Sequence, residues 1–199
     1  MTVTETTHLR ASGFDSEQSV CLPSEGYFAR LSQRPPSPDI HLSNLPLKAS
    51  GPGHTHNGHI RWTPGINPPQ KDRNNRKEQL RLRGTKYVRG IGMHAPCALA
   101  YELKPTYARF VALAGVDENI GGQEMGSNLA MHPSVRFRVL IDGKLMAESP
   151  VMRILEEPWR FDVTIPEGSR VLRLVAMDGG DGNREDLANW VNPGFVCKE

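Results

Sequence analysis

The sequence predicts an all-β protein, an antiparallel jelly-roll β-sandwich, and three observations support this prediction. Several segments alternate apolar and polar residues, which is the two-residue period of a half-buried strand. Turns rich in Gly, Pro, Asn and Asp separate these segments. Little of the chain shows the longer period of an amphipathic helix, so roughly seven or more short strands are expected.

The N-terminal residues 1–39 are predicted to form a flexible, disordered tail ahead of a single domain formed by residues 40–199. They are polar and rich in Ser, Thr and Pro, and they show neither helical nor strand periodicity. Their apolar cluster, Gly26 to Leu31, is too short to form a core. With 199 residues, the chain is long enough for one well-buried domain and a tail.

The first strands of the domain are expected at residues 79–84, 97–103 and 107–116. In the first, "QLRLRG", Leu80 and Leu82 face inward and the arginines face outward. The second, "CALAYEL", has one apolar face. The third, "YARFVALAGV", is apolar on one face and partly apolar on the other, which is typical of a central strand.

The later strands are linked by clear turn signals. "SVRFRVLI" at residues 134–141 alternates, and Asp142–Gly143 after it tolerates the positive φ angles of a two-residue hairpin turn. "WRFDVTI" at residues 159–165 alternates again, and it is expected to point Trp159 into the core. "PEG" at residues 166–168 then predicts another hairpin, which leads into "SRVLRLVAM".

Charge does not indicate a partner. The 24 Lys and Arg residues nearly balance the 22 Asp and Glu residues, so no nucleic-acid partner is expected. The basic interval from Lys71 to Arg89 is interpreted as a solvated face. No apolar run of about 18 residues is present, so no membrane span is expected. The first residues lack the basic start and apolar core of an export signal, and the compartment is left open.

Cysteine usage is equally uninformative about the compartment. Cys21, Cys97 and Cys197 form an odd set without a C-x-x-C pair, so neither a disulfide framework nor a thiolate zinc site is indicated. Cys97 lies on the apolar side of an expected strand and is interpreted as a small buried hydrophobic residue. Whether Cys97 and Cys197 pair is left open.

Four segments, taken in order, resemble the NPCBM family of carbohydrate-binding modules that accompany glycoside hydrolases. These segments are "LRGTKYVRGIGMHAP", "YARFVALAGVDENI", "VRFRVLIDGKLMAES" and "GDGNREDLANWVNPGF", and the resemblance covers His41 to Phe195. It implies a galactose-binding-like β-sandwich with ligand loops at one end, often a bound calcium, and binding without catalysis. It also implies a location outside the cytoplasm.

Two loops depart from the family pattern. "GPGHTHNGHIRWTPGIN" at residues 51–67 is rich in His, and residues 119–134 form a long insert between two core strands. His54, His56 and His59 have a spacing that a metal site can use, but a flexible loop is favoured because no carboxylate or cysteine stands nearby. Both loops can reshape a ligand site, so the family's sugar specificity is not assumed.

A sugar site needs an aromatic face and planar polar groups that share hydrogen bonds with hydroxyls. Trp190 and Trp62 are the candidate platforms, although each is equally credible as a packed structural residue. The hydrogen-bonding candidates are His94, Arg89, Asn119, Asn189 and Asp186. Arg89 precedes the "GIG" segment and is expected beside His94, which is interpreted either as a sugar ligand or as a histidine that ties two loops together.

The acidic stretch "DGGDGNREDLANW" does not match an EF-hand, because Asn192 occupies the place of its bidentate Glu. Another calcium geometry is possible, which combines Asp178, Asp181 or Asp186 with backbone carbonyls and with Asp117 from another loop. Plain turn formation also explains the glycines.

The sequence therefore predicts a non-catalytic module that binds a glycan, with galactose-type sugars among the candidates. Another protein or an attached enzyme domain is a further expected partner. The alternative is a protein-interaction or structural β-sandwich that has lost sugar binding. A stand-alone hydrolase requires two facing carboxylates in a cleft, which sequence alone does not reveal.

Overall fold

The structure, a computed structural model, describes residues 34–47, 68–119, 133–183 and 185–198 with their side chains, and the backbone of short strands between residues 7 and 60. The chain divides into two compact units, Met1–Arg34 and Pro35–Glu199. In the first unit, β1 (Thr7–Ala11) pairs with β4 (Ser24–Phe28), and β2 (Phe14–Asp15) pairs with β3 (Gln18–Ser19). Most of the predicted tail lies outside the described residues, so its flexibility stays a prediction.

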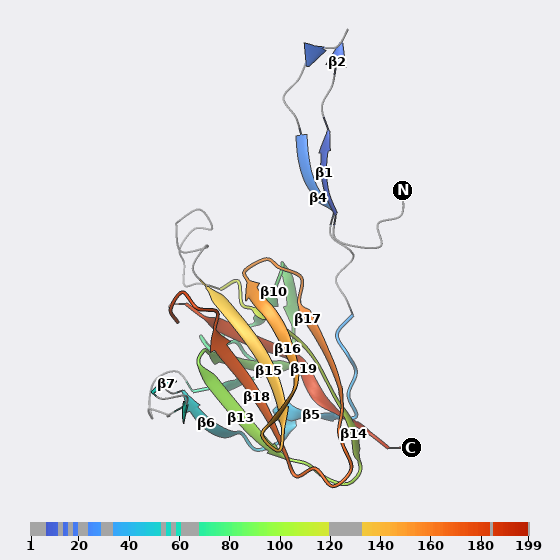
Figure 1. Ribbon diagram of the computed structural model, residues 1–199, viewed down its shortest axis with the longest axis vertical. Helices are drawn as coiled ribbons and strands as arrows, with labels where there is room; N and C mark the ends of the chain where they lie inside the picture. The colour runs from blue at the N-terminus through green and yellow to red at the C-terminus, as the bar shows by residue number, and fades with distance from the viewer. Residues whose placement is uncertain are drawn as a thin grey trace. The chain divides into compact units, whose positions relative to one another are not determined.

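The second unit is a sandwich of two antiparallel sheets, which confirms the predicted fold class (Figure 1). The six-stranded sheet contains, in order, β17 (Trp159–Thr164), β14 (Tyr107–Val116), β19 (Leu187–Cys197), β12 (Gly90–His94) and β9 (Gln70–Lys71), and β5 (Ile40–His41) also pairs with β19. The five-stranded sheet contains β16 (Lys144–Arg153), β15 (Ser134–Ile141), β18 (Val171–Asp178), β13 (Cys97–Glu102) and β6 (Lys48–Pro52).

Three short elements complete the unit. A 3-10 turn, η1 (Leu42–Asn44), follows β5, and two small hairpins are formed by β7 (Thr55–His56) with β8 (His59–Ile60) and by β10 (Leu80–Leu82) with β11 (Thr85–Tyr87). No helix in the described part of the chain is long and apolar enough to cross a membrane.

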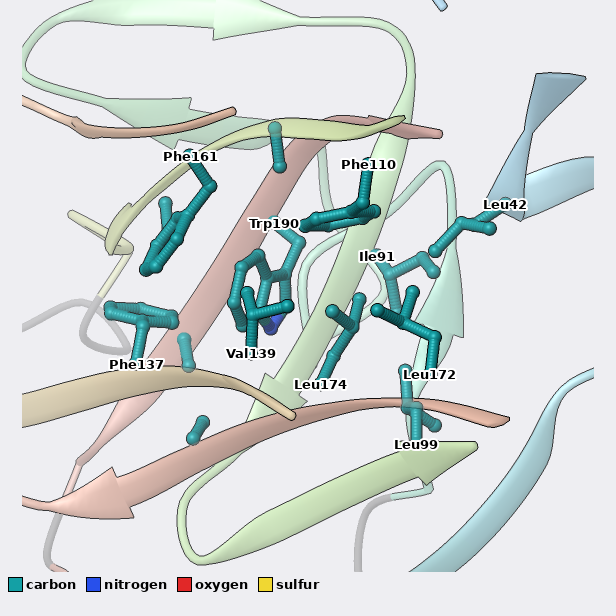
Figure 2. Close-up of a cluster of buried hydrophobic side chains, with 14 of the residues drawn as sticks. Leu42, Ile91, Leu99, Phe110, Phe137, Val139, Phe161, Leu172, Leu174 and Trp190 are labelled. Carbon is teal, nitrogen blue, oxygen red and sulfur yellow. The ribbon is translucent and has the colours of Figure 1, made fainter. Parts of the chain in front are cut away.

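The main core lies between the two sheets and is centred on Trp190 (Figure 2). The indole of Trp190 is fully buried, and the rings of Phe110, Phe137 and Phe161 surround it with centroids 6.1, 5.2 and 5.2 Å away. These residues come from both sheets because alternate side chains of each strand point inward. Aromatic pairs at such distances stabilise a core beyond the area that they bury.

A second, smaller core lies on the outer face of the six-stranded sheet, beneath the β10–β11 hairpin. Leu80, Leu82 and Tyr87 of the hairpin pack there against Leu113 and Val191. The prediction that the leucines of "QLRLRG" face inward is confirmed, although they face this outer cluster and not the space between the sheets.

The turn signals gave one correct and one wrong prediction. Asp142 and Gly143 have φ angles of 49° and 83°, and Ile141 pairs with Lys144, so the predicted two-residue hairpin is confirmed. The hairpin predicted at residues 166–168 is wrong, because β17 pairs with β14 whereas β18 pairs with β13 and β15. This turn therefore carries the chain from one sheet to the other.

Trp159 and the two described cysteines lie as follows in the sandwich. Trp159 was expected in the core but is 41% exposed, because it begins β17 at the edge of its sheet. Cys97 is buried, and burial raises the pKa of its thiol to about 12, as fits a small hydrophobic residue. Cys97 and Cys197 are both free thiols.

Candidate functional site

The carboxylate of Asp117, a predicted metal ligand, is fully buried and occupied by protein donors. Its Oδ1 accepts hydrogen bonds from Asn74 Nδ2 at 3.0 Å and from the Asn119 backbone N–H at 2.8 Å. Its Oδ2 accepts from the Arg81 backbone N–H at 3.1 Å and from Asn189 Nδ2. Four donors satisfy this carboxylate, so Asp117 acts as an anchor between strands and loops.

The same network explains where the predicted sugar ligands Asn189 and Asn119 lie. Asn189 is fully buried beneath residues 72–78, and its amide donates to Asp117. Asn119 is only partly buried, but its backbone N–H belongs to the same network. Asn189 therefore holds the fold together through its Nδ2, and its Oδ1 is buried without a hydrogen-bond partner among the described residues.

Residues 72–78 cover this network because Gly92 allows their backbone to approach β12. A Cβ at Gly92 would lie 2.4 Å from Asn74 Cα and 2.5 Å from Arg73 O. The Gly92 N–H also donates to Arg73 O at 3.0 Å. Asn74 closes the loop by accepting the backbone N–H groups of Arg76 and Glu78 at its Oδ1. The segment is therefore fixed firmly to the sheet.

Trp190 does not form a stacking platform, because its indole has no exposed area and forms the centre of the core. Of the two alternatives in the sequence, the structural one is correct for this residue. Trp62 lies outside the described residues, as do the side chains of His54, His56 and His59. Among the tryptophans whose side chains the structure describes, only Trp159 is exposed.

The acidic stretch forms a tight loop between β18 and β19. Oδ1 of Asp178 accepts the backbone N–H groups of Gly180, Asp181 and Gly182 at 2.8–3.2 Å. Asp181 accepts from the Ser134 hydroxyl and from Arg153, the latter at 3.3 Å. Turn formation therefore accounts for Asp178, whereas contacts with β15 and β16 account for Asp181.

Asp186 differs from its neighbours because one of its oxygens is buried without a partner. Oδ1 accepts the Ser134 N–H at 2.9 Å, whereas Oδ2 has no hydrogen-bond partner. The pKa of Asp186 is raised to about 8, chiefly by burial; the Ser134 N–H and the charge of Arg153 lower it, and the charges of Asp178 and Asp181 raise it. A bound cation would favour the ionised form of this group.

The four predicted metal ligands do not come together as one set. Asp117 faces Asn74 and Asn189, whereas Asp186 faces Ser134 in the opposite sheet. Within the described ranges, no group of three or more His, Cys, Asp or Glu side chains could hold a metal ion. Of the four, Asp186 fits a cation best, and calcium binding stays a prediction.

Arg89 does not lie beside His94, and this prediction is wrong. The "GIG" segment belongs to β12, so the two residues stand at opposite ends of a five-residue strand, about 16 Å apart. His94 is half-buried at the end of β12, where its Nδ1 lies 2.7 Å from Ala95 O. Sequence proximity was misleading because the expected turn is an extended strand.

Arg89 instead organises an exposed polar group that we call the Arg89 cluster. It consists of His41, Ser43, Asn44, Asp72 and Arg89. Arg89 Nη1 donates to Asn44 Oδ1 at 2.8 Å and lies 3.5 Å from Asp72 Oδ2. The side chains of Arg89 and Asp72 are 43% and 37% exposed, so both groups can meet a ligand.

Two further features prepare the Arg89 cluster for hydrogen bonding. Asp72 is fixed by its own contact with the Gly90 N–H at 3.0 Å. The pKa of His41 is lowered, first by burial and then by the charge of Arg89, with Asp72 acting in the opposite direction. His41 Nδ1 is buried and has no hydrogen-bond partner among the described residues, which fits the lowered pKa of this ring.

This arrangement can bind adjacent hydroxyl groups. A guanidinium donates, a carboxylate accepts, and an amide or a neutral imidazole can do both. Sequence reasoning found Arg89 but missed His41, Asn44 and Asp72. No local signal marks these three residues, because they come from separate segments that the fold brings together.

The fold is a two-sheet β-sandwich of the type found in carbohydrate-binding modules. A family model described as the NPCBM/NEW2 domain matches residues 40–196, and the chain belongs to this family. The resemblance seen in the sequence is thereby confirmed.

Solved structures and a curated relative agree with this assignment. The CBM51 of Clostridium perfringens GH95 in complex with methyl-galactose has a TM-score of 0.63 and 27% identity, and the match covers 79% of this chain and 99% of that one. The C. perfringens ZmpB structure of CBM51-2 with GlcNAc and INT domains has a TM-score of 0.62 and 26% identity, covering 96% and 37%.

The alpha-1,3-galactosidase B of Akkermansia muciniphila is 32% identical over 124 residues, which is 61% of this chain and 14% of that protein. The chain spans only 10% and 14% of the lengths of the curated relatives that it matches.

Proposed function

We propose that the chain is a non-catalytic carbohydrate-binding module that recognises a galactose-type glycan. The observation that carries this proposal is the similarity to the CBM51 structure in complex with methyl-galactose, which extends over 99% of that chain. The similarity to CBM51-2 with bound GlcNAc makes an N-acetylated sugar the first competitor to test. Both neighbours are binding modules, which supports binding without turnover.

We place the sugar at the Arg89 cluster. The guanidinium of Arg89 is already held by Asn44 and Asp72, so little side-chain freedom is lost when a ligand binds. Asp72 and Asn44 present oxygens, and His41 lies beside them with its Nδ1 buried. A shallow exposed site of this kind binds weakly on its own, and attachment to an enzyme or to clustered glycans would raise its avidity.

The proposed attachment follows from the relatives. The curated proteins that match are much longer, and their names are those of glycosidases. We expect the module to hold such an enzyme on its glycan substrate, so that the effective concentration of substrate at the catalytic domain rises.

The test is calorimetric titration of the chain with methyl-galactose and with GlcNAc. Arg89→Ala should weaken binding of the preferred sugar about tenfold or more, because it removes hydrogen bonds from a charged donor. Arg109→Ala is the matched control, since Arg109 pairs with Asp162 on β14 and β17 and is similarly exposed.

Three results would contradict the proposal. If the folded chain binds neither sugar nor any glycan on an array, the protein-interaction alternative takes its place. If both arginine variants lose binding equally, the sugar does not lie at the Arg89 cluster. Turnover of a glycoside by the purified chain would contradict the non-catalytic assignment.

A further inference from the structure

A groove of about 250 Å³ lies at the end of the sandwich opposite the acidic loop. It runs between the β13–β14 turn, the β17–β18 turn and Lys198. β14 begins at this end with Tyr107 and reaches the Asp117 network at the other, about 30 Å away. The groove therefore shares no residue with the Arg89 cluster or with the predicted calcium ligands.

The floor of the groove is apolar and rigid. Tyr107 and Ile165 are both buried, and the Tyr107 ring stacks on Phe195 with centroids 4.1 Å apart. Pro105 and Pro166 form part of the walls and restrict their backbone. A neighbouring cavity of about 230 Å³ shares Lys104 and Tyr107, so the floor continues beyond the groove.

Backbone hydrogen bonds join the walls to one another. Leu103 N–H donates to Arg170 O at 2.8 Å, which connects the two turns. Lys198 N–H donates to Thr106 O at 2.9 Å, and Ile165 N–H donates to Ala108 O at 2.9 Å. The groove is thus preformed, and a ligand would not have to order it.

The rim of the groove carries three exposed cations, Lys104, Arg170 and Lys198, against one acid, Glu167. None of the three cations forms a salt bridge with any residue that the structure describes. Elsewhere in the same unit, eight arginines have carboxylate partners: Arg76, Arg81, Arg83, Arg89, Arg109, Arg136, Arg138 and Arg153. Other exposed basic residues, such as Lys86, Lys144 and Arg173, also lack a carboxylate partner in the described ranges, but only at this groove do three such cations border one apolar floor.

We propose that the groove is a second binding site, which takes a saccharide carrying a carboxylate or a sulfate ester. The three cations complement the anionic group, and the apolar floor complements the C–H face of a sugar ring. This proposal rests on the proposed function only because it takes the ligand to be a saccharide. The residues of the groove are different from those of the Arg89 cluster. A module with both sites would recognise a neutral and an anionic sugar at two separate places on its surface.

The test compares two double variants that remove the same charge. Lys104→Gln with Lys198→Gln alters the groove, and Lys86→Gln with Lys144→Gln alters exposed lysines outside both the groove and the Arg89 cluster. Calorimetric titration uses N-acetylneuraminyl-lactose and glucuronate as carboxylate probes, and galactose 6-sulfate as the sulfate probe. Methyl-galactose serves as the neutral probe of the Arg89 cluster.

The groove variant should weaken at least one anionic probe about tenfold, while the control variant and the methyl-galactose affinity stay unchanged. Comparison of the titrations with the carboxylate probes and with the sulfate probe identifies which anion the groove prefers. Failure of all anionic probes, or equal weakening in both variants, would overturn the groove site. If polyglutamate bound at the groove more strongly than the anionic saccharides did, the assignment of a saccharide ligand would be overturned. If the groove variant instead lost only methyl-galactose binding, the neutral sugar would lie at the groove, which would contradict its placement at the Arg89 cluster.

Discussion

The carboxyl group of Asp186 should make the stability of the fold depend on pH. Its pKa is about 8 in the folded chain and 3.8 in the unfolded chain. As pH rises, this group therefore loses its proton at a lower pH in the unfolded chain than in the folded chain. The free energy of unfolding should therefore fall between about pH 4 and pH 8, by up to about 1.4 kcal/mol per pH unit from this group, and should level off above. Urea denaturation across this range in EDTA measures the slope.

Asp186→Asn is the variant that isolates this slope, because the amide does not ionise and keeps an acceptor for the Ser134 N–H. The lowered pKa of Asp181 acts in the opposite direction, but it is common to both proteins. An identical pH profile for both proteins contradicts the prediction. The same pair tests the predicted calcium, since Ca²⁺ bound at Asp186 should raise the melting temperature of the native chain and not of the variant.

Residues 72–78 form the element on which both the buried network and the Arg89 cluster depend. Gly92→Ala should destabilise the chain by about 1–3 kcal/mol, because the added Cβ would meet backbone atoms of Asn74 that cannot move independently. The shift of this segment should also displace Asp72 and weaken sugar binding. Thermal unfolding and methyl-galactose titration measure both effects, with the exposed Thr164→Ser as control. Unchanged stability would show that the segment is not held as described.

Local signals sufficed for individual strands and for one turn, but not for the connections between strands. Asp142–Gly143 was predictable because the two-residue hairpin depends on these residues alone. The turn at residues 166–168 looked the same locally, yet it joins different sheets, since strand partners are chosen by long-range packing. Trp159 was misplaced for a similar reason, because alternation does not reveal which strand lies at an edge.

The site was less predictable than the fold because polar residues serve two purposes that look alike in sequence. Asp117 and Asn189 have the chemistry of a ligand site, but they are buried and bond to each other. Asn44, Asp72 and Arg89 form the exposed group only after three distant segments meet. Burial decides between these roles, and burial depends on the whole tertiary structure.

The molecule as a whole should tolerate loss of its first unit but not loss of the segment that follows it. Asp39 donates its N–H to Phe195 O at 2.9 Å and accepts the Cys197 N–H at 2.8 Å, and Pro36 O accepts from Asn192 at 3.1 Å. These bonds and β5 fasten residues 36–41 to β19.

A chain that begins at Pro35 should therefore unfold at the same temperature as the 199-residue chain, because Pro35–Glu199 is a compact unit by itself. A chain that begins at Leu42 should lose about 2–4 kcal/mol, since several hydrogen bonds of about 1 kcal/mol each are removed and the apolar side chain of Ile40 no longer covers the core. Circular dichroism melting of the three chains at equal concentration measures the difference. Equal stability of the two shortened chains would show that residues 36–41 do not contribute to the sandwich, whereas a large loss on starting at Pro35 would show that the two units fold together.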